Sequence, residues 1–474
     1  MQRACLVLVL CVAGLLAGCA AVKSTFTTNP GSSASGTPSV SVTIFPAKVG
    51  VVHDGTMSFS ASVSGSNNAN LTWSVKEGAS AGTIDSNGTY TAPATLGVFH
   101  IVATSQADPS KSATASVTVT SSGFTTISGL NYARLQQTAT LLRSGKVLIA
   151  GGGVGPDTID GYSVVDQAEL FDPATKTFNV AGQIARDSHT ATLLQSGDVL
   201  LVGGESGWDP HGNAYGNPSP IVVDTAEIVQ VASGLSSVPT GNMLVARESQ
   251  AASLLSDGRV LITGGEYDIP VNPFWGELTE SEVFDPATGK FTAVGQMTTA
   301  RAFHTSTLLQ NGKVLITGGE YPAFSNTAEL FDPATDTFRL TGNMAVQRGF
   351  HTATFLPNGK VLIIGNSALA ELYDPSTERF SPAGTMNFSR VWHTATLLPN
   401  GTVLIAGGST DNGSTKTTEI YDPATGVFTM GPSMEQDRML HTATLLANGD
   451  VLIAGGAASD GIDITVLASA EIFH

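Results

Sequence analysis

A pattern of alternating hydrophobic and polar positions recurs from about residue 123 to the end of the chain. Each copy contains an alternating strand such as HTATLL, a turn such as NGK, and an uninterrupted apolar strand such as VLIAGG. After a loop of variable length come a strand like AELFDP and a last strand like TFRLTGNM. Alternation is typical of strands with one exposed face, and a short apolar run between turns is typical of a strand buried on both faces. The pattern therefore predicts four strands in each copy and very little helix.

The copies recur at a spacing of about 40 to 50 residues, which is typical of the four-stranded blades of a β-propeller. The last copy stops at ASAEIFH, before a fourth strand, whereas the first segment of the region, GFTTISGLNYAR, has the layout of that missing strand. We expect the first strand to complete the last blade, because this pairing leaves no free sheet edge. Seven blades are predicted, and their copies begin near Gln137, His189, Gln250, His304, His351, His393 and His441.

Three features of the copies together resemble the kelch repeat. They are the glycine pair after the apolar strand, an Arg-x-x-His segment before the first strand, and a Glu-x-Tyr/Phe-Asp-Pro strand. The resemblance implies an all-β, seven-bladed kelch-type β-propeller over residues 123–474. No WD dipeptide ends a copy, which argues against WD40 blades. The second copy has AEIVQVASG where others read AELFDPATG, and the fifth has IIGN in place of the glycine pair, so we expect irregular outer edges there.

Composition and charge narrow the range of partners. The chain has 39 acidic and 22 basic residues, a formal net charge of −17, and no run of Lys or Arg. Such a field repels phosphate backbones, so we expect no nucleic-acid partner. The 52 glycines and a charged fraction of only 13% fit a protein of strands and turns with few exposed helices.

Residues 1–18 have the pattern of an export signal. Arg3 precedes an apolar run from Ala4 to Leu16 that is too short to span a bilayer with margin. The ending LAGC resembles the lipobox of bacterial lipoproteins, which implies that Cys19 becomes the acylated first residue of the mature chain. Ala20 stands where Asp would favour inner-membrane retention, so the resemblance implies the outer membrane if the host has one. The alternative is an ordinary signal peptide with an incidental cysteine. We expect an exported protein that is anchored to the membrane by lipid.

Two further segments separate the signal from the repeats. Residues 19–38 are rich in Ser, Thr, Gly and Pro and are predicted to form a flexible tether. Residues 39–120 contain short strands such as VSVTIF, NLTWSV and ATASVTV, the spacing of a small β-sandwich. The stretches LTWSV and GTIDSNGTYTAP resemble bacterial immunoglobulin-like domains. The resemblance implies a spacer or adhesive module, in which we expect Trp73 to be a core residue.

Arginine, glutamate and histidine recur at fixed positions of the copies. A catalytic site is asymmetric and needs its acid or base in one place, so we interpret the Arg and Glu sets as structural ion pairs or backbone hydrogen bonds. Gln replaces His in two copies and imitates the hydrogen bonds of neutral imidazole, but it is a poor metal ligand, so we expect hydrogen bonding there and no metal. The arginines are Arg134, Arg186, Arg247, Arg301, Arg348, Arg390 and Arg438, and the glutamates are Glu169, Glu227, Glu282, Glu329, Glu371, Glu419 and Glu471.

Long loops after the glycine pairs of the first three copies are the candidate ligand-binding surface. In an up-and-down blade these loops lie on the same face as the Arg-x-x-His segments, and loops on a rigid scaffold are where recognition usually resides. Their aromatic rings can stack on sugars or apolar peptide groups, or they can pack the loops onto the rim. The candidates are Tyr162, Trp208, His211, Tyr215, Tyr267, Phe274 and Trp275, with Trp392 on the same face.

The residue before the His position also differs between the copies. The residue before the His position is Phe303, Phe350, Trp392 and Leu440 in copies four to seven, but Ser188 and Ser249 in copies two and three. Asp157, Asp160 and Asp166 of the first loop have the chemistry of calcium ligands, although their spacing matches no EF-hand loop. No metal site is predicted.

A kelch propeller with an attached immunoglobulin-like domain also resembles the galactose oxidase family of copper radical oxidases. Those enzymes use a Tyr crosslinked to Cys, a second Tyr and two His at copper. The predicted propeller has no cysteine, and no Tyr-His dipeptide occurs in the chain, so the resemblance covers fold and not chemistry. We assign no catalytic residue and no cofactor. The sequence favours a lipid-anchored binding protein for a glycan or a protein; the alternative is a secreted carbohydrate-active enzyme, isomerase or oxidase-like, on the same scaffold.

Overall fold

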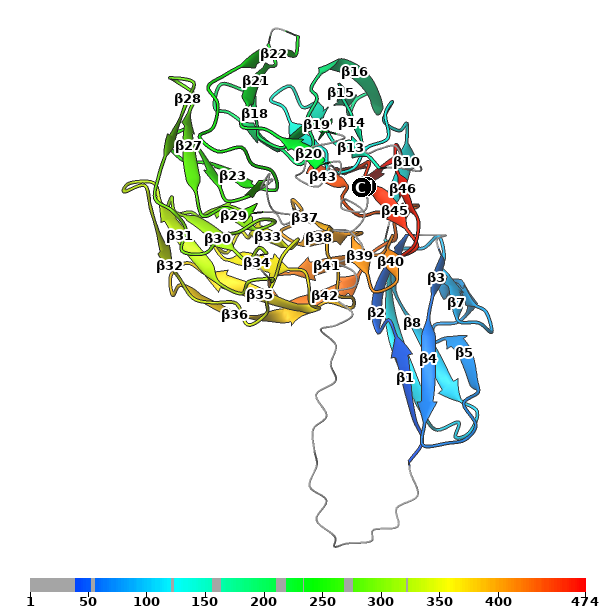
Figure 1. The fold of residues 1–474 in the computed structure, drawn as a ribbon. Coiled ribbons are helices and arrows are strands. Elements are labelled where there is room, and N and C mark those ends of the chain that lie inside the picture. The colour runs from blue at the N-terminus through cyan, green and yellow to red at the C-terminus, as the bar shows by residue number, and fades with distance from the viewer. Residues whose placement is uncertain are drawn as a thin grey trace, which may run out of the picture. The chain divides into compact units, whose positions relative to one another are not determined.

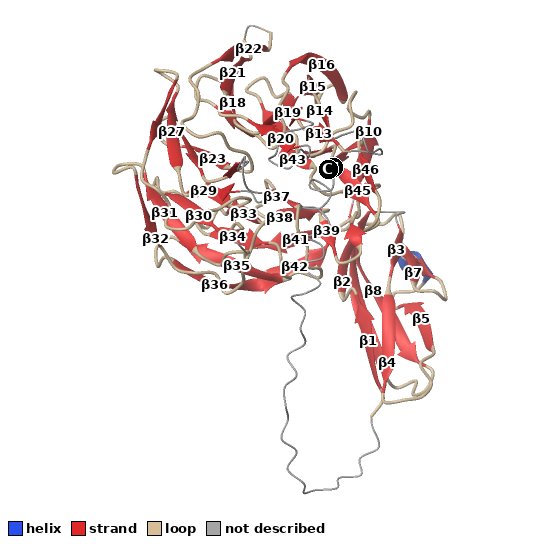
Figure 2. Cartoon of the chain, in the orientation of Figure 1, coloured by secondary structure: helices blue, strands red, loops and turns tan. Residues whose placement is uncertain are grey.

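The computed structural model describes residues 39–52, 56–120, 123–155, 163–209, 219–232, 234–267, 276–320 and 323–474. These residues form two compact units. The N-terminal unit extends to Gly123 and includes Thr429–Ser433, and the repeat unit comprises Phe124–Phe428 and Met434–His474. Strands dominate both units (Figure 2), and the one helical element of the described residues is the short 3-10 helix η1 (Ala79–Ala81). No described helix is long and apolar enough to cross a membrane.

The N-terminal unit consists of short strands in small sheets. Its central strands β8 and β9 pair antiparallel, β9 also pairs with the parallel strand β2, and β8 pairs with β5. β1 pairs antiparallel with β4 in a second small sheet, and β1 packs against β8 and β9. The strands are β1 (Ser41–Phe45), β2 (Lys48–Val52), β3 (Thr56–Ser58), β4 (Ser60–Ser64), β5 (Leu71–Val75), β6 (Thr83–Ile84), β7 (Thr89–Thr91), β8 (Gly97–Ser105) and β9 (Ser112–Thr120).

The repeat unit contains seven four-stranded antiparallel groupings within the described residues, which we call sheets one to seven in chain order. Sheets one to three contain β11 (Thr138–Leu141), β12 (Val147–Ala150), β15 (Gln167–Asp172) and β16 (Thr177–Gln183); β17 (Thr190–Leu193), β18 (Val199–Val202), β21 (Ala226–Gln230) and β22 (Ser236–Pro239); and β23 (Ala251–Leu254), β24 (Val260–Thr263), β27 (Ser281–Asp285) and β28 (Lys290–Ala293). Sheets four to seven contain β29 (Thr305–Leu308), β30 (Val314–Thr317), β31 (Ala328–Asp332) and β32 (Thr337–Leu340); β33 (Thr352–Phe355), β34 (Val361–Ile364), β35 (Leu369–Asp374) and β36 (Arg379–Thr385); β37 (Thr394–Leu397), β38 (Val403–Ala406), β41 (Thr418–Asp422) and β42 (Val427–Met430); and β43 (Thr442–Leu445), β44 (Val451–Ala454), β47 (Ala470–Phe473) and β10 (Phe124–Ile127).

Short two-stranded ribbons follow the second strand in five of the sheets, as far as the structure describes the loops. They occupy the loop positions that the sequence analysis places on one face. The ribbons pair β13 (Gly153–Val154) with β14 (Ser163–Val164), β19 (Glu205–Asp209) with β20 (Ser219–Val222), β25 (Glu266–Tyr267) with β26 (Gly276–Glu277), β39 (Ser409–Thr410) with β40 (Gly413–Ser414), and β45 (Ala457–Ser459) with β46 (Ile464–Val466).

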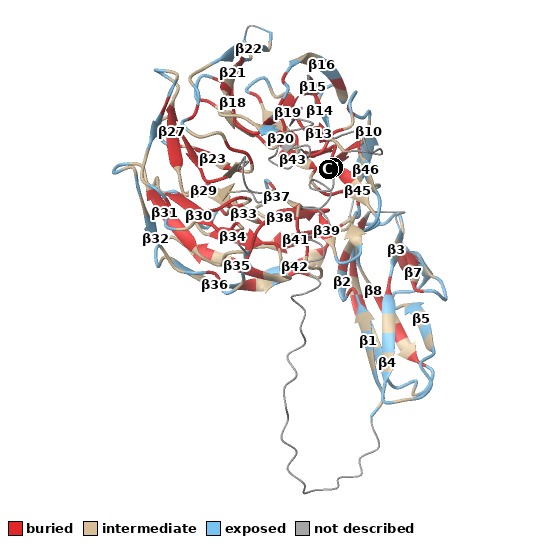
Figure 3. Ribbon diagram, viewed as in Figure 1, coloured by how far each residue is buried: buried red, intermediate tan, exposed pale blue. Residues whose placement is uncertain are grey.

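The core of the repeat unit lies between neighbouring sheets. The second strand of every sheet is buried along its whole length (Figure 3), as the uninterrupted apolar runs predict. Val147 and Ile149 of sheet one, for example, pack with Leu452 and Ile472 of sheet seven. Each such side chain contributes about 1.5 to 3 kcal/mol when it is fully buried. The sheets are arranged around a common centre (Figure 1), because each shares a core with both of its neighbours.

The first strand of the repeat unit completes the last sheet. β10 pairs antiparallel with β47, with Phe124 opposite Phe473 and Ile127 opposite Ala470. The Phe124 and Phe473 ring centroids are 5.2 Å apart. This is the pairing that the truncated last copy predicts.

Sheets two and five contain all four strands although their sequences depart from the repeat. In the fifth copy, Asn366 replaces the second glycine of the pair and adopts a φ of 60°. Asparagine tolerates this left-handed conformation better than other residues that have a side chain. The outer pairing of sheet five carries a register shift at Ala370 and Glu371, and sheet one has the same irregularity without an unusual sequence. An irregular outer edge is therefore not specific to the two copies whose sequences depart from the repeat.

Candidate functional site

Every sheet contains an Arg–Glu ion pair whose side chains are largely buried. Arg134 donates from Nη2 to Oε1 of Glu169 over 2.8 Å and from Nη1 to the carbonyl of Gly151 over 2.9 Å. The glutamate also accepts the backbone N–H of Asn131. Equivalent ion pairs occur in the other six sheets, with N···O distances of 2.6 to 3.1 Å. The prediction that these recurrent charges are structural pairs is confirmed, and the pairs form within single sheets.

The repeated histidines are also structural. His351 Nε2 lies 3.0 Å from Thr317 Oγ1 of the preceding sheet, and its ring packs against Gly318. A Cβ added at Gly318 would lie 2.7 Å from the His351 ring and 2.4 Å from the carbonyl oxygen of Arg348, so the first glycine of the pair leaves room for the next sheet. Burial and the nearby guanidinium of Arg348 lower the pKa of His351 to about 3, so the ring is neutral. Gln250 takes the same place and donates to the carbonyl of Val202.

A circle of seven residues with left-handed backbone runs through the sheets, one residue before each His or Gln. Their φ values lie between 51° and 56°. The amides of six of these residues donate to the carbonyl of the counterpart in the preceding sheet, over 3.1 to 3.3 Å. The amide of Ser188 donates instead to Oδ1 of Asp187. The conformation therefore belongs to the scaffold, and the side chain at each position is free to vary. The residues of this circle are Gln136, Ser188, Ser249, Phe303, Phe350, Trp392 and Leu440.

Aromatic side chains occupy consecutive positions of the circle in sheets four to six. The ring centroids of Phe303 and Phe350 are 4.2 Å apart, and those of Phe350 and Trp392 are 5.2 Å apart. Phe324, from the loop of sheet four, meets Phe350 edge-on at 6.0 Å. All four side chains are partly exposed. We call these four residues, which form a chain of ring contacts, the aromatic crescent.

Acidic residues gather beside the circle in sheets two to four, where Glu266, Glu277 and Glu320 are partly exposed and three further acids are buried. Asp187 pairs with Glu205 and Glu248 pairs with Glu266 in isolated antiparallel bridges, so two carboxyls stand side by side in each of sheets two and three. Glu277 lies opposite Glu266 in the loop ribbon of sheet three. Like charges directly opposite each other on paired strands destabilise a sheet. We call these acidic residues the carboxylate band: Asp187, Glu205, Glu248, Glu266, Glu277 and Glu320.

Burial raises the pKa of every member of the carboxylate band, and repulsion between carboxylates adds to the rise for Asp187, Glu248, Glu266 and Glu320. Asp187, Glu205 and Glu248 are buried, and burial together with the charge of Glu205 raises the pKa of Asp187 and of Glu248 well above the usual range. Burial, with repulsion from Glu277, Glu320 and Glu205, raises the pKa of Glu266 to about 8. Carboxyls with such shifts concentrate at functional sites.

The aromatic crescent and the carboxylate band meet in sheet four. Glu320 forms backbone bridges to both Ala302 and Phe324. Ala302 directly precedes Phe303, and Phe324 contacts Phe350. A ligand that lies across this point therefore has carboxyls on one side and aromatic rings on the other.

Most of the predicted ligand-binding residues lie outside the described residues. These are Tyr162, His211, Tyr215, Phe274 and Trp275, together with Asp157 and Asp160 of the calcium hypothesis. The backbone of Trp208 lies in β19 opposite Pro220, and its side chain is not among those described. Tyr267 is partly buried in β25, opposite Gly276, and the exposed Asp166 accepts a hydrogen bond from its neighbour Gln167. Of the predicted residues whose side chains the structure describes, Tyr267 and Trp392, only Trp392 belongs to the surface described above.

Sequence reasoning missed the carboxylate band. The signal is present as GGE at residues 203–205, 264–266 and 318–320, where the other copies have no acid after the glycines. Asp187 and Glu248 stand two residues before the His or Gln position, where the other copies have apolar residues or glycine. The six residues come together only when three sheets stack side by side. The described residues contain no group of three or more His, Cys, Asp or Glu side chains arranged to hold a metal ion.

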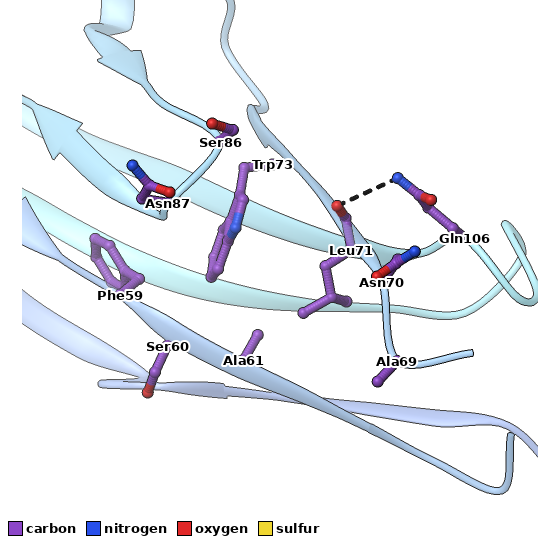
Figure 4. A pocket seen from close by; sticks show the side chains of 10 residues that line it. All are labelled: Phe59, Ser60, Ala61, Ala69, Asn70, Leu71, Trp73, Ser86, Asn87 and Gln106. Atoms are coloured by element: carbon purple, nitrogen blue, oxygen red, sulfur yellow. Dashed lines mark hydrogen bonds between the residues drawn. The ribbon is translucent and has the colours of Figure 1, made fainter. Parts of the chain in front are cut away.

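The N-terminal unit has a separate hollow of 540 Å³, between β4 and β5. Figure 4 shows Trp73 standing between Phe59 and Leu71, with amide side chains nearby; that of Gln106 donates to the carbonyl of Leu71 over 3.5 Å. Trp73 is only partly buried, although the sequence analysis expects a core residue. Its ring packs against the turn at Gly88, where an added Cβ would lie 3.0 Å from the indole. The hollow is an open edge of the core of this unit.

Comparisons with known proteins support the fold. Residues 393–435 match the family model of the Kelch motif. No relative was found among curated proteins. Among solved structures, the chain is similar to a novel fungal alcohol oxidase of the AA5 family in complex with copper, with a TM-score of 0.55 and 17% sequence identity over 74% of this chain and 76% of that one. The repeat unit thus has an all-β, kelch-type, galactose oxidase-like propeller fold, and at this identity the likeness concerns the fold alone.

Proposed function

We propose that the repeat unit is a seven-bladed propeller that binds a glycan or a protein on the surface formed by the aromatic crescent and the carboxylate band. The aromatic crescent carries this proposal. A left-handed backbone suits glycine or asparagine best, yet the chain places Phe303, Phe350 and Trp392 at three consecutive positions of the circle. The scaffold requires this conformation at all seven positions but does not require a large ring, since Ser188 and Ser249 meet the same requirement. Partly exposed aromatic rings in mutual contact supply stacking faces for a ligand.

The proposal includes the rest of the chain. The LAGC motif supports lipid attachment at Cys19 and export, with the outer membrane as destination where one exists. Residues 19–38 serve as tether, and residues 39–120 as an immunoglobulin-like spacer that holds the propeller away from the membrane. Loop residues Trp208 and Trp275 belong to the proposed surface by their position in the sequence.

The proposal is tested by ligand screening of the full chain on glycan arrays and against extracellular protein libraries, followed by affinity and melting measurements on variants. Trp392→Ala and Phe350→Ala are expected to weaken binding at least tenfold and to change the melting temperature little, because stacking residues at a surface contribute more to recognition than to folding. Leu340→Ala is the control, since Leu340 is 55% exposed on the outermost strand of sheet four. Equal affinity of Trp392→Ala and the unmodified chain for every ligand found would refute the proposed surface.

A carbohydrate-active enzyme is the second candidate. The pKa of Glu266, raised to about 8 mainly by burial, leaves a carboxyl that can donate or accept a proton near neutral pH. Turnover of mono- and oligosaccharides that disappears in Glu266→Gln would favour this second function over binding alone.

A further inference from the structure

No cationic side chain of the described residues pairs with a carboxyl of the carboxylate band, although Glu248 and Glu205 share a side-chain hydrogen bond. None of the ion pairs among the described residues involves a member of the band. Asp187 Oδ1 accepts the backbone N–H of Ser188 over 2.6 Å. Its Oδ2 atom and Oε2 of Glu205 are buried without a hydrogen-bond partner in the described part of the chain, and Asp187 is 0% exposed.

The carboxylate band differs from the Arg–Glu pairs of the seven sheets in how its charge is neutralised. There every buried glutamate has an arginine within 3.1 Å and accepts further hydrogen bonds, so the scaffold neutralises the acids that it needs. A buried ionised carboxylate without a partner is costly, so such a group either stays protonated or requires a compensating cation. The acids of the band are also confined to sheets two to four, so the repeat does not require them.

We propose that the carboxylate band binds a cationic group of the ligand, an ammonium or a guanidinium, and that the aromatic crescent contacts the apolar part or the face of the same cation. This inference rests on the proposed binding function and specifies its chemistry. Carboxylates neutralise and accept hydrogen bonds from such a group. Aromatic faces attract it through the ring quadrupole, and desolvation strengthens that attraction. The meeting of the two surfaces at Glu320 and Phe324 places both kinds of contact within reach of one ligand.

The cation can come from a small organic amine or from a Lys or Arg side chain of a protein. Both present the same charge, and both fit a surface with acids on one side and rings on the other. The two sources differ in size, because a protein side chain is attached to a backbone with amide groups. The probes below distinguish them.

Binding of the cation is linked to loss of protons from the band. Glu266 is faced by Glu277 across the loop ribbon, by Glu248 across the isolated bridge, and by Glu205 and Glu320 from the neighbouring sheets. With its pKa raised to about 8, this carboxyl is largely protonated at pH 6, and a cation favours the ionised form. Affinity for the cation is therefore expected to rise between pH 5.5 and pH 8.5.

Calorimetric titration of the full chain tests the proposal with four probes: tetramethylammonium, n-butylammonium, N-acetyl-lysinamide and N-acetyl-argininamide, with 1-butanol as neutral control. At least one cation is expected to bind, more tightly at pH 8.5 than at pH 5.5, and 1-butanol is not. Tighter binding of the two amino-acid amides assigns the cation to a protein side chain, and equal or tighter binding of the simple ammonium ions assigns it to a small amine.

Variants then locate the site. Glu266→Gln and Glu248→Gln are expected to weaken binding of the cation at least tenfold, and Trp392→Ala to weaken it by a smaller factor. Glu435→Gln is the matched control, because Glu435 is exposed and lies outside the band. Melting curves of each variant show whether it folds, and the amide variants keep the shape of the carboxyl.

Absence of binding by all four cations, or equal binding by Glu266→Gln and the unmodified chain, would overturn the inference. A second result would also overturn the inference: the chain binds calcium but no organic cation, and Glu266→Gln abolishes the calcium binding. The carboxylate band would then be a metal site. The proposed function is tested separately, because it depends on Trp392 and a glycan or protein ligand. If Trp392→Ala loses the glycan or protein ligand and no cation binds the unmodified chain, the proposed binding function stands. Only the inference that the ligand is cationic is then refuted.

Discussion

Arg390 Nη2 lies 2.8 Å from Oε1 of Glu419, and both side chains are completely buried within sheet six. The arginine also donates to the carbonyl of Gly407. Truncating one partner of such a pair leaves the other charge buried, which costs about 3 to 5 kcal/mol. We expect Arg390→Ala to lower the free energy of unfolding by this amount, measured by urea denaturation followed by circular dichroism.

Arg339→Ala is the control for that prediction. Arg339 pairs with Glu378, but the two side chains are 47% and 37% exposed. Exposed pairs contribute about 0 to 1 kcal/mol, so this variant should unfold almost as the unmodified chain does. Similar losses in the two variants would show that burial of Arg390 and Glu419 does not set the strength of the pair.

The pairing of β10 with β47, which completes sheet seven, gives a second prediction. β10 is the fourth strand of sheet seven, and Ile127 packs against the core that sheets seven and one share. Deletion of residues 123–129 exposes an unpaired strand edge and part of that core, so we expect a melting temperature several degrees lower and a tendency to aggregate. Deletion of residues 20–38, in the predicted tether, should leave the melting temperature unchanged. Equal melting temperatures would mean that closure does not depend on this strand.

Repetition explains which parts of this structure can be predicted from the sequence. A residue that recurs in every copy, such as Arg390 or Glu419, has a role that every copy shares, so its structural pairing can be inferred without coordinates. The strand order and the completion of sheet seven follow for the same reason. The residues of the proposed site are ones that break the repeat, and the sequence of a single copy does not show which residues of the neighbouring copies face them.

The carboxylate band illustrates that limit. Asp187 and Glu248 are 61 positions apart in the sequence, and their surroundings are set by how neighbouring sheets stack and by the bridges to Glu205 and Glu266. The aromatic residues of the circle can be found in the sequence because each precedes a repeated histidine, whereas the long loops show the larger number of aromatic residues. The immunoglobulin-like assignment of residues 39–120 and the lipid anchor stay predictions.

Lipid attachment is tested at Cys19. If this residue is acylated, Cys19→Ser is expected to abolish labelling by a clickable palmitate analogue and to release the protein into the soluble fraction, because no cysteine follows residue 19 in the sequence. Cys11→Ser, in the predicted signal, should leave labelling and fractionation unchanged. A Cys19→Ser variant that remains lipidated in the membrane fraction would contradict the assignment.

The buried histidines predict loss of stability in acid. Burial and Arg348 lower the pKa of His351 to about 3 from an ordinary value near 6.5, so the folded chain holds this ring neutral while the unfolded chain protonates it. The stabilising contribution is present above pH 6.5 and is lost as the pH falls toward 3. At pH 4 one such histidine destabilises the fold by on the order of 3 kcal/mol relative to neutral pH, at about 1.4 kcal/mol per pKa unit.

His351→Gln is expected to remove this part of the acid sensitivity, because the chain already uses Gln137 and Gln250 at the same position, where each donates to a backbone carbonyl of the preceding sheet. The measurement is the free energy of unfolding at pH 4 and pH 7.5 for the variant and the unmodified chain. We expect the difference between the two pH values to shrink in His351→Gln, while the stability at pH 7.5 changes by less than about 1.5 kcal/mol. His474→Gln is the control, since His474 is exposed at the end of the chain. An unchanged pH difference in His351→Gln would show that His351 does not become protonated on unfolding in this range, and acid sensitivity would then have to come from other groups.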